Sequence, residues 1–149
     1  MQKNLASASA PAYTPTRSPS KIQAVGIVIP AHNQAGTIAK CISSIFAANS
    51  HSGWRNSLWI VVVADACTDD TAKAARGALG AFGQVLEVST RSGQAAHQLG
   101  AATVMEHFHA VPRHTLLLTS TDVAADLPRD WIDMQLQCSQ SPIGLVSSH

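Results

Sequence analysis

The stretch LWIVVVA at residues 58–64 decides the fold, because every one of its side chains is apolar. A strand with one face in solvent alternates apolar and polar residues, whereas a strand covered by helices on both faces is apolar throughout. We therefore expect residues 58–64 to form a central strand of a parallel sheet. The stretch is also far shorter than the roughly 20 apolar residues that cross a bilayer, and the sequence predicts no transmembrane segment.

Short β-branched runs alternate with segments of helical periodicity around this strand. AVGIVI (residues 24–29) is the expected first strand, and Pro30 closes it because proline cannot donate to a ladder. QVLEVS (84–89), TLLLT (115–119) and a short run at 143–147 are the other expected strands. This alternation predicts an α/β domain with a doubly wound, mainly parallel sheet.

The spacing of apolar and capping residues predicts four helices. The first begins at Thr37, the second has Thr68 as its N-cap and ends at Gly80, and the third runs from residue 94 to about residue 109. The last follows Pro128. The side chains expected on the apolar faces are Ile38, Cys41, Ile42, Ile45 and Phe46 in the first helix, Ala96, Gly100, Val104 and Phe108 in the third, and Trp131, Met134 and Cys138 in the last.

Composition narrows the class of protein. The 149 residues fit one domain, and 46% apolar residues, 13% charged residues and a net charge of +1 argue against a disordered chain and against a nucleic-acid binder. Residues 1–21 are rich in Ser, Ala, Pro and Thr and are expected to be a disordered tail, with the domain at 22–149. The first residues lack the apolar run of a secretory signal, and the three cysteines form no C-x-x-C motif. A cytoplasmic protein is therefore expected.

Polar residues follow each expected strand directly. His32 and Asn33 follow the first strand, Asp65 the second, Arg91 and Gly93 the third, and Asp122 the fourth. Ligands of open parallel sheets bind outside the carboxyl ends of the strands, where these residues should converge. A carboxylate accepts from a base or a ribose hydroxyl, whereas arginine and helix N-termini favour phosphate. Each residue alone is explained equally well as a turn or capping residue, but together they predict a nucleotide pocket.

Four blocks of the sequence resemble a known family. VGIVIPAHNQAGTIAKCISSIF, WIVVVADACTDDTAKAAR, RSGQAAHQLGA and LLLTSTDVAADLPRDWI are similar, in order and spacing, to the blocks of family 2 glycosyltransferases. Those enzymes have the nucleotide-diphospho-sugar transferase fold of GT-A type. The resemblance runs from Val25 to Trp131, about two thirds of the chain. It implies a nucleoside-diphosphate sugar as donor and an unknown acceptor, either a saccharide or a lipid-linked group.

The resemblance also implies roles for individual residues. Pro30, His32 and Asn33 match the family's turn under the nucleotide, and Asp65 matches the acidic residue that bonds to the base. Gly93 and His97 match a glycine and a usual arginine beside the base and ribose. Asp122 matches the first carboxylate of the D-x-D signature, which holds a divalent cation, Mn²⁺ or Mg²⁺, on the diphosphate.

The chain departs from the family pattern at several positions. Ala124 occupies the place of the second D-x-D carboxylate, so Asp126 is the remaining metal-ligand candidate, and Gln34 replaces a common glutamate. The acceptor-binding half and catalytic base of the family normally follow this region, but the sequence given ends at His149. The alternative prediction is therefore a truncated or degenerate module that binds nucleotide without transfer, and a ligand-free interaction domain is a third reading.

Three other features have less support. In the His-rich region at 106–114, Glu106 and His109 are the only pair with the helical spacing needed to share a metal ion. Cys67 has no adjacent histidine that could activate it as a nucleophile. Trp54 and Trp59 are interpreted as core or interface residues rather than as platforms for base stacking.

Overall fold

The computed structural model describes residues 22–52, 57–123, 127–138 and 146–147 of the chain. They contain one parallel sheet in the order β3-β2-β1-β4-β5. Its strands are β1 (Ala24–Ala31), β2 (Ser57–Asp65), β3 (Gly83–Val88), β4 (Leu116–Ser120) and the two-residue β5 (Val146–Ser147). The chain moves outward from β1 to β3 and then returns to the other side of β1 for β4, so the strand order reverses between β1 and β4.

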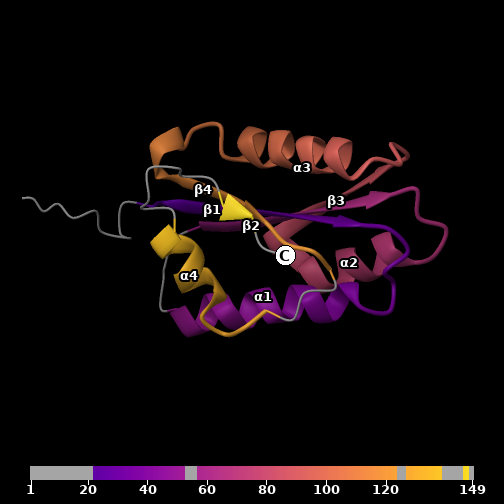
Figure 1. Cartoon of the computed structure of the whole chain (residues 1–149), viewed down its shortest axis with the longest axis horizontal. Helices are drawn as coiled ribbons and strands as arrows, with labels where there is room; N and C mark the ends of the chain where they lie inside the picture. Colours follow the sequence, from indigo (N-terminus) through magenta and orange to yellow (C-terminus); the bar gives the residue numbers. More distant parts are fainter. Residues whose placement is uncertain (1–21, 53–56, 124–126, 139–145, 148–149) are drawn as a thin grey trace, which may run out of the picture.

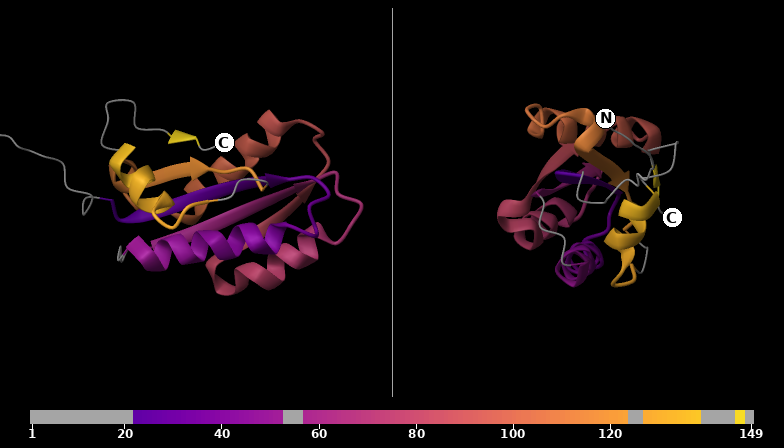
Figure 2. Two further views of the ribbon diagram at one scale, coloured as in Figure 1. Left: turned by 60° about the horizontal axis from the view of Figure 1, so that its bottom comes forward. Right: turned by 90° about the vertical axis from the view of Figure 1, so that its left-hand side faces the viewer.

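Helices cover both faces of the sheet (Figures 1 and 2). One face carries α1 (Ile38–Ser52), α2 (Thr71–Leu79) and α4 (Trp131–Cys138), and the other carries α3 (Gly93–His107). The connections from β1 to β2, from β2 to β3 and from β3 to β4 share one hand, so reversing the direction of travel after β3 places α3 opposite α1 and α2. Short 3-10 turns, η2 (Gly80–Phe82) and η3 (Arg113–Thr115), precede β3 and β4. The expectation of a doubly wound α/β fold is confirmed at this level.

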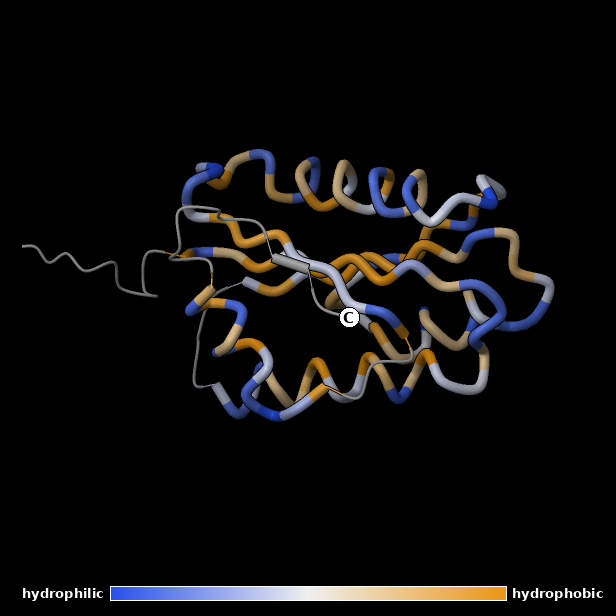
Figure 3. The backbone as a smooth tube through the Cα atoms, in the orientation of Figure 1, coloured by the Kyte–Doolittle hydropathy of each residue, from blue (hydrophilic) through white to orange (hydrophobic). Residues whose placement is uncertain are grey.

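The strands alternate between two hydrophobic cores, and their apolar character stands out in Figure 3. Ile60 and Val62 of β2 pack with α1, α2 and α4, whereas Val61 and Val63 pack with α3. All four side chains are fully buried. Burial on both faces is the reason why residues 58–64 contain no polar side chain.

Glycines let α3 approach the sheet closely. A Cβ atom built on Gly100 would lie 2.4 Å from Cγ1 of Val28, and one built on Gly26 would lie 2.1 Å from Cγ1 of Val104. Both distances are too short for real contacts, so these positions leave no room for a side chain. The expectation that Ala96, Gly100, Val104 and Phe108 face the sheet is confirmed, since all four are buried.

The expected end of the first strand is wrong. β1 continues through Pro30 to Ala31, and Pro30 is in register with Val63 of β2. Pairing with β4 ends earlier, at Val28 and Ser120. From Pro30 onward β1 therefore has a neighbour on one side only, and an edge of this kind tolerates a residue without an N–H donor.

Two helix predictions also need correction. The second helix begins at Thr71 with Asp70 as its N-cap, and the N–H of Thr68 instead bonds to the side chain of Asn33 at 2.8 Å. In α4, Trp131 is buried as expected, but Met134 and Cys138 are exposed. The buried face is Trp131, Ile132, Gln135 and Leu136. Gln135 can face the core because the hydroxyl of Thr119 donates to its side-chain oxygen at 2.8 Å.

No helix in the described part of the chain has the length and apolar character needed to span a membrane. The expected short last strand is confirmed in its final part as β5. The proposed tail at 1–21, together with Trp54, Ala124 and Asp126, lies outside the described residues.

The close contact of α3 gives a test of the fold. We expect Gly100→Ala to lower the free energy of unfolding by about 1–3 kcal/mol, because the added methyl group overpacks Val28. The matched variant is Gly77→Ala in α2, where a Cβ atom meets open space, and it should stabilise the protein by about 0.5–1 kcal/mol through helix propensity. Urea denaturation measures both. Equal effects of the two substitutions would contradict the packing described here.

Candidate functional site

A cavity of about 450 Å³ opens at the carboxyl edge of the sheet, at the point where the strand order reverses. The N–H of Thr121 donates to the carbonyl of Val28 at 3.1 Å, and beyond this bond β1 and β4 have no further paired residues. The two strands then lead to different sides of the cavity. Its lining residues are Pro30, Ala31, His32, Gln34, Asp65, Ala66, Arg91, Ser92, Gly93, Ala96 and Asp122.

The loops after β1, β2 and β3 each contain a non-glycine residue in the left-handed backbone region. These residues are Asn33 (φ 51°), Ala66 (φ 55°) and Arg91 (φ 55°). Such a conformation costs roughly 1–2 kcal/mol for an L-residue other than asparagine or aspartate, so other contacts must hold Ala66 and Arg91 in place. All three lie at the rim of the cavity or next to a lining residue.

The loop after β1 is held by side chains of the loop after β2. Its successive backbone N–H groups at Asn33, Gln34 and Ala35 donate to Cys67 Sγ (3.3 Å), Thr71 Oγ1 (2.8 Å) and Asp69 Oδ2 (3.2 Å). The segment CTDDT (67–71) therefore accepts hydrogen bonds from backbone N–H groups that precede α1, and it also contains the N-cap and the first residue of α2. The hydrogen bond from Thr71 and the bond from the Ala35 N–H lower the pKa of Asp69 below its ordinary value of 3.8, against an opposing effect of burial.

His32 connects the same two loops from inside the cavity. Its Nδ1 lies 2.9 Å from the backbone carbonyl oxygen of Asp65, which can only accept, so Nδ1 carries the proton. Nε2 is then the acceptor of the neutral ring, and the side-chain amide of Asn33 approaches it at 3.4 Å. The ring is therefore oriented by both neighbours before any ligand binds.

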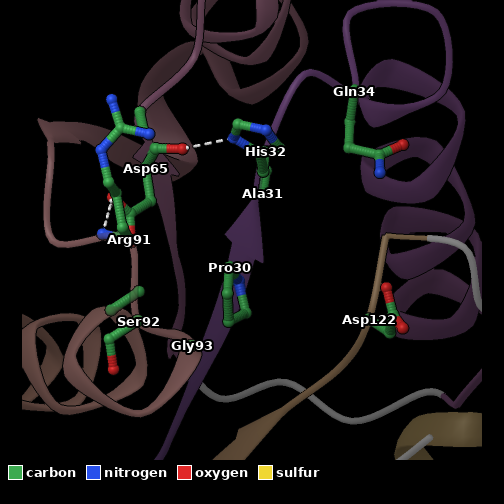
Figure 4. Close-up of a pocket in the computed structure, with 11 residues that line it drawn as sticks. Pro30, Ala31, His32, Gln34, Asp65, Arg91, Ser92, Gly93 and Asp122 are labelled. Carbon is green, nitrogen blue, oxygen red and sulfur yellow. Dashed lines mark hydrogen bonds between the residues drawn. The ribbon is translucent and has the colours of Figure 1, made fainter.

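The Asp65 carboxylate connects the loop after β2 to the loop after β3 (Figure 4). Oδ2 accepts from the hydroxyl of Thr90, and Oδ1 accepts from the N–H of Arg91 at 3.0 Å. Asp65 is only 7% exposed. The Thr90 bond, followed by the Arg91 bond, holds the pKa of Asp65 below its ordinary value of 3.8, although burial acts in the opposite direction. Asp65 is thus an ionised group that stabilises the conformation of its neighbouring loop.

Asp122 lies across the cavity from Arg91 and Ser92 (Figure 4). It lies two residues beyond the end of β4, so it stands on the other side of the strand reversal from Asp65. Burial of the Cys41 thiol is the main cause that raises its pKa to about 11, and the charge of Asp122 adds to this effect. Cys41 is therefore protonated and unreactive at neutral pH.

Most of the residues predicted from the sequence do meet at the cavity. Its lining includes Pro30, His32, Asp65, Arg91, Gly93 and Asp122. Asn33 is outside the lining but bonds to Thr68, and His97 also lies outside it, half-buried on α3. His97 lies outside the lining because of helix geometry. Ala96 faces the cavity and the sheet, and the side chain of the next residue points about 100° away from it around the helix axis.

The sequence reasoning did not predict Ala31, Ala66, Ser92 or Ala96 as lining residues, and it treated Gln34 only as a departure from the family. The sequence does indicate a structural role for Ser92, because a serine directly before a helical segment is a preferred N-cap. Its hydroxyl accepts from the N–H of Ala95 at 3.2 Å. The alanines had no signal, since small apolar side chains mark a cavity only through the space they leave.

The other sequence candidates have structural explanations. Among the described residues, no group of three His, Cys, Asp or Glu side chains could hold a metal ion, and His109 bonds to the carbonyl of Glu106 at 3.1 Å. Trp59 stacks on His107 with ring centroids 3.8 Å apart, as expected for a packing role. Cys67 accepts the Asn33 N–H described above.

The lowered pKa of Asp65 gives a test by pH. A carboxyl group with a folded pKa below its unfolded value stabilises the protein above the unfolded pKa, and this stabilisation is lost as pH falls through the folded pKa. We expect Asp65→Asn to be less stable than the wild type at pH 7, with the difference shrinking below about pH 4. Urea denaturation between pH 7 and pH 2.5 measures this. The control, Asp130→Asn at an exposed position, should follow the wild-type profile, and a constant difference for Asp65→Asn would contradict the assignment.

Comparison with known proteins leaves the assignment to the geometry of the site. No protein-family model matches the chain, and no curated protein matches it. The cavity, the residues that line it and the resemblance in the sequence are the features that bear on its function.

Proposed function

We propose that the cavity binds a nucleoside-diphosphate sugar and that the protein is a glycosyltransferase of family 2 type. The observation that carries the proposal is the position of the cavity, since it lies where β1 and β4 separate and unites residues from four strand ends. Open α/β sheets bind nucleotides at this place. The volume of about 450 Å³ is within the range of small-ligand sites.

Different parts of the lining suit different parts of such a ligand. We assign the base and ribose to the wall formed by His32, Asp65 and Gly93, and the diphosphate to the opening between Arg91 and Asp122. Gly93 leaves room for a ligand on this wall. A Cβ atom there would meet open space, so neither packing nor backbone geometry requires glycine, and its lack of a side chain enlarges the cavity at the start of α3.

A divalent cation, Mn²⁺ or Mg²⁺, is part of the proposal. Mg²⁺ is commonly held by one or two carboxylates together with substrate phosphates. Asp122 provides one carboxylate at the cavity, and the second candidate, Asp126, is outside the described residues. The cation would neutralise charge on the departing diphosphate.

In the proposed reaction the bond from the anomeric carbon to the diphosphate oxygen breaks, and the diphosphate leaves with the electron pair. An acceptor hydroxyl forms the new bond and gives its proton to a base. Arg91 is suited to stabilise the negative charge of the leaving group. We assign no residue as the base, and the acceptor, a saccharide or a lipid-linked group, is not identified.

The second candidate function is nucleotide binding without transfer. Ala124 at the place of the second metal-binding carboxylate favours it. Measuring nucleoside diphosphate released from the donor sugar separates the two. Release that depends on an added acceptor supports transfer, whereas binding without release supports the second candidate.

Thermal unfolding with nucleoside diphosphates and their sugars, with and without Mn²⁺, tests the donor site. A ligand at 100 times its dissociation constant adds about 2.7 kcal/mol of stability. We expect one nucleotide to raise the melting temperature selectively, and Gly93→Leu, which fills the cavity, to abolish that rise. The matched control Gly77→Leu also adds a side chain in open space but lies away from the lining, and it should keep the rise. Equal shifts in both variants would refute this cavity as the binding site.

A further inference from the structure

We propose that Asp65 is a positioning residue, whose carboxylate holds the loop at residues 89–92 so that Arg91 and Gly93 face the cavity. This inference rests on the proposed function, because it concerns the same ligand. It differs from the role that the sequence resemblance implies, in which the carboxylate bonds directly to the base. The structure assigns both carboxylate oxygens to the loop: one accepts from Thr90, and the other from the Arg91 N–H at 3.0 Å.

Thr90 completes this arrangement from outside the cavity. Its hydroxyl donates to Asp65 and accepts from the N–H of Ser92 at 3.1 Å, yet Thr90 is not among the lining residues. The turn from Thr90 to Ser92 is thereby closed, and Ser92 is left in place as the N-cap of α3. Thr90 can affect a ligand only through the loop, which makes it the means of testing the role of Asp65.

Arg91 is the residue whose position depends most on this bond. Its φ of 55° is unfavourable for an arginine, and its N–H is held by a carboxylate that is itself almost fully buried. Within the described part of the chain, Arg91 is also the one Lys or Arg side chain in the lining. The conformation imposed by Asp65 therefore decides where the cationic side chain of the cavity lies.

Other charged and titratable groups lie near Asp65 or across the cavity from it. His32 bonds to the Asp65 carbonyl, Cys67 Sγ lies 3.9 Å from the same oxygen, and Asp122 is on the opposite wall. The Asp65 carboxylate itself is bonded to the loop, so its protonation would release Thr90 and Arg91. Ligand affinity should then fall at acidic pH, and the Thr90 bond should influence the pH at which it falls.

The experiment compares Thr90→Val, Thr90→Ser, Asp65→Asn and the double variant Asp65→Asn/Thr90→Val. Thr103→Val is the control, because the Thr103 hydroxyl bonds only within α3, to the Leu99 carbonyl at 2.8 Å. Calorimetry uses whichever of ADP, CDP, GDP, TDP and UDP stabilises the wild type most. We expect Thr90→Val and Asp65→Asn each to weaken binding about tenfold, and the double variant to be no weaker than Asp65→Asn. Thr90→Ser and Thr103→Val should bind like the wild type.

Two further measurements separate positioning from general loss of structure. Thr90→Val should move the acidic decline of affinity to higher pH, because the Thr90 bond is the largest cause of the lowered pKa of Asp65. Amide hydrogen exchange without ligand should be faster at Arg91 and Ser92 in Thr90→Val and unchanged in Thr103→Val.

The outcomes distinguish this inference from the proposed function. If the wild type binds a diphosphate and only Asp65→Asn weakens it, Asp65 contacts the ligand directly and the positioning role is wrong. Unchanged exchange at Arg91 in Thr90→Val would overturn it as well. If no diphosphate binds the wild type, the proposed function fails, and the positioning role for this ligand fails with it.

Discussion

The separation of β1 from β4 is the constraint on which the site depends. Up to Val28 the two strands are paired, and the Thr121 N–H closes the last bond between them. Beyond this bond, the end of β1 and the loop after it contribute Pro30, Ala31, His32 and Gln34 to the cavity, and the segment after β4 contributes Asp122. The cavity therefore lies where the strand order reverses, which is the place where open α/β sheets bind ligands.

The strand reversal creates the space, and polar contacts between loops determine its shape. Side chains after β2 hold the loop after β1 through three successive N–H groups, and Asp65 holds the loop after β3. Hydrogen bonds of this kind satisfy backbone donors that loops otherwise leave to water. They also help to hold Ala66 and Arg91 in the left-handed backbone conformation, which is unfavourable for these residues. The wall formed by these three loops is therefore organised before a ligand binds, which reduces the entropy lost on binding.

The sequence predicts most of the architecture because the hydrophobic period is a local property. The apolar run at 58–64 identified the central strand, and the polar residues after the strands were correctly expected at one edge, since parallel strands end together. The errors concern properties that depend on distant partners. Pro30 lies within β1 because β4 stops pairing earlier, and the buried face of α4 includes Gln135 because Thr119 bonds to it. The role of CTDDT was missed because its partners are 34 to 37 residues away.

The charges of the cavity explain why a cation belongs to the proposal. Among the described residues, two carboxylates, Asp65 and Asp122, and one arginine line the space. Asp65 is already engaged by Thr90 and the Arg91 N–H, so its charge is partly compensated by these donors. Asp122 faces the cavity from the other wall, where a diphosphate would meet a charge of its own sign. On that side a cation would offset the repulsion between a diphosphate and Asp122, whereas the Arg91 side suits an anion directly. In the proposed complex the two walls would therefore orient the ligand, because the charge of Asp122 would call for a metal and the loop held by Asp65 would place the guanidinium of Arg91.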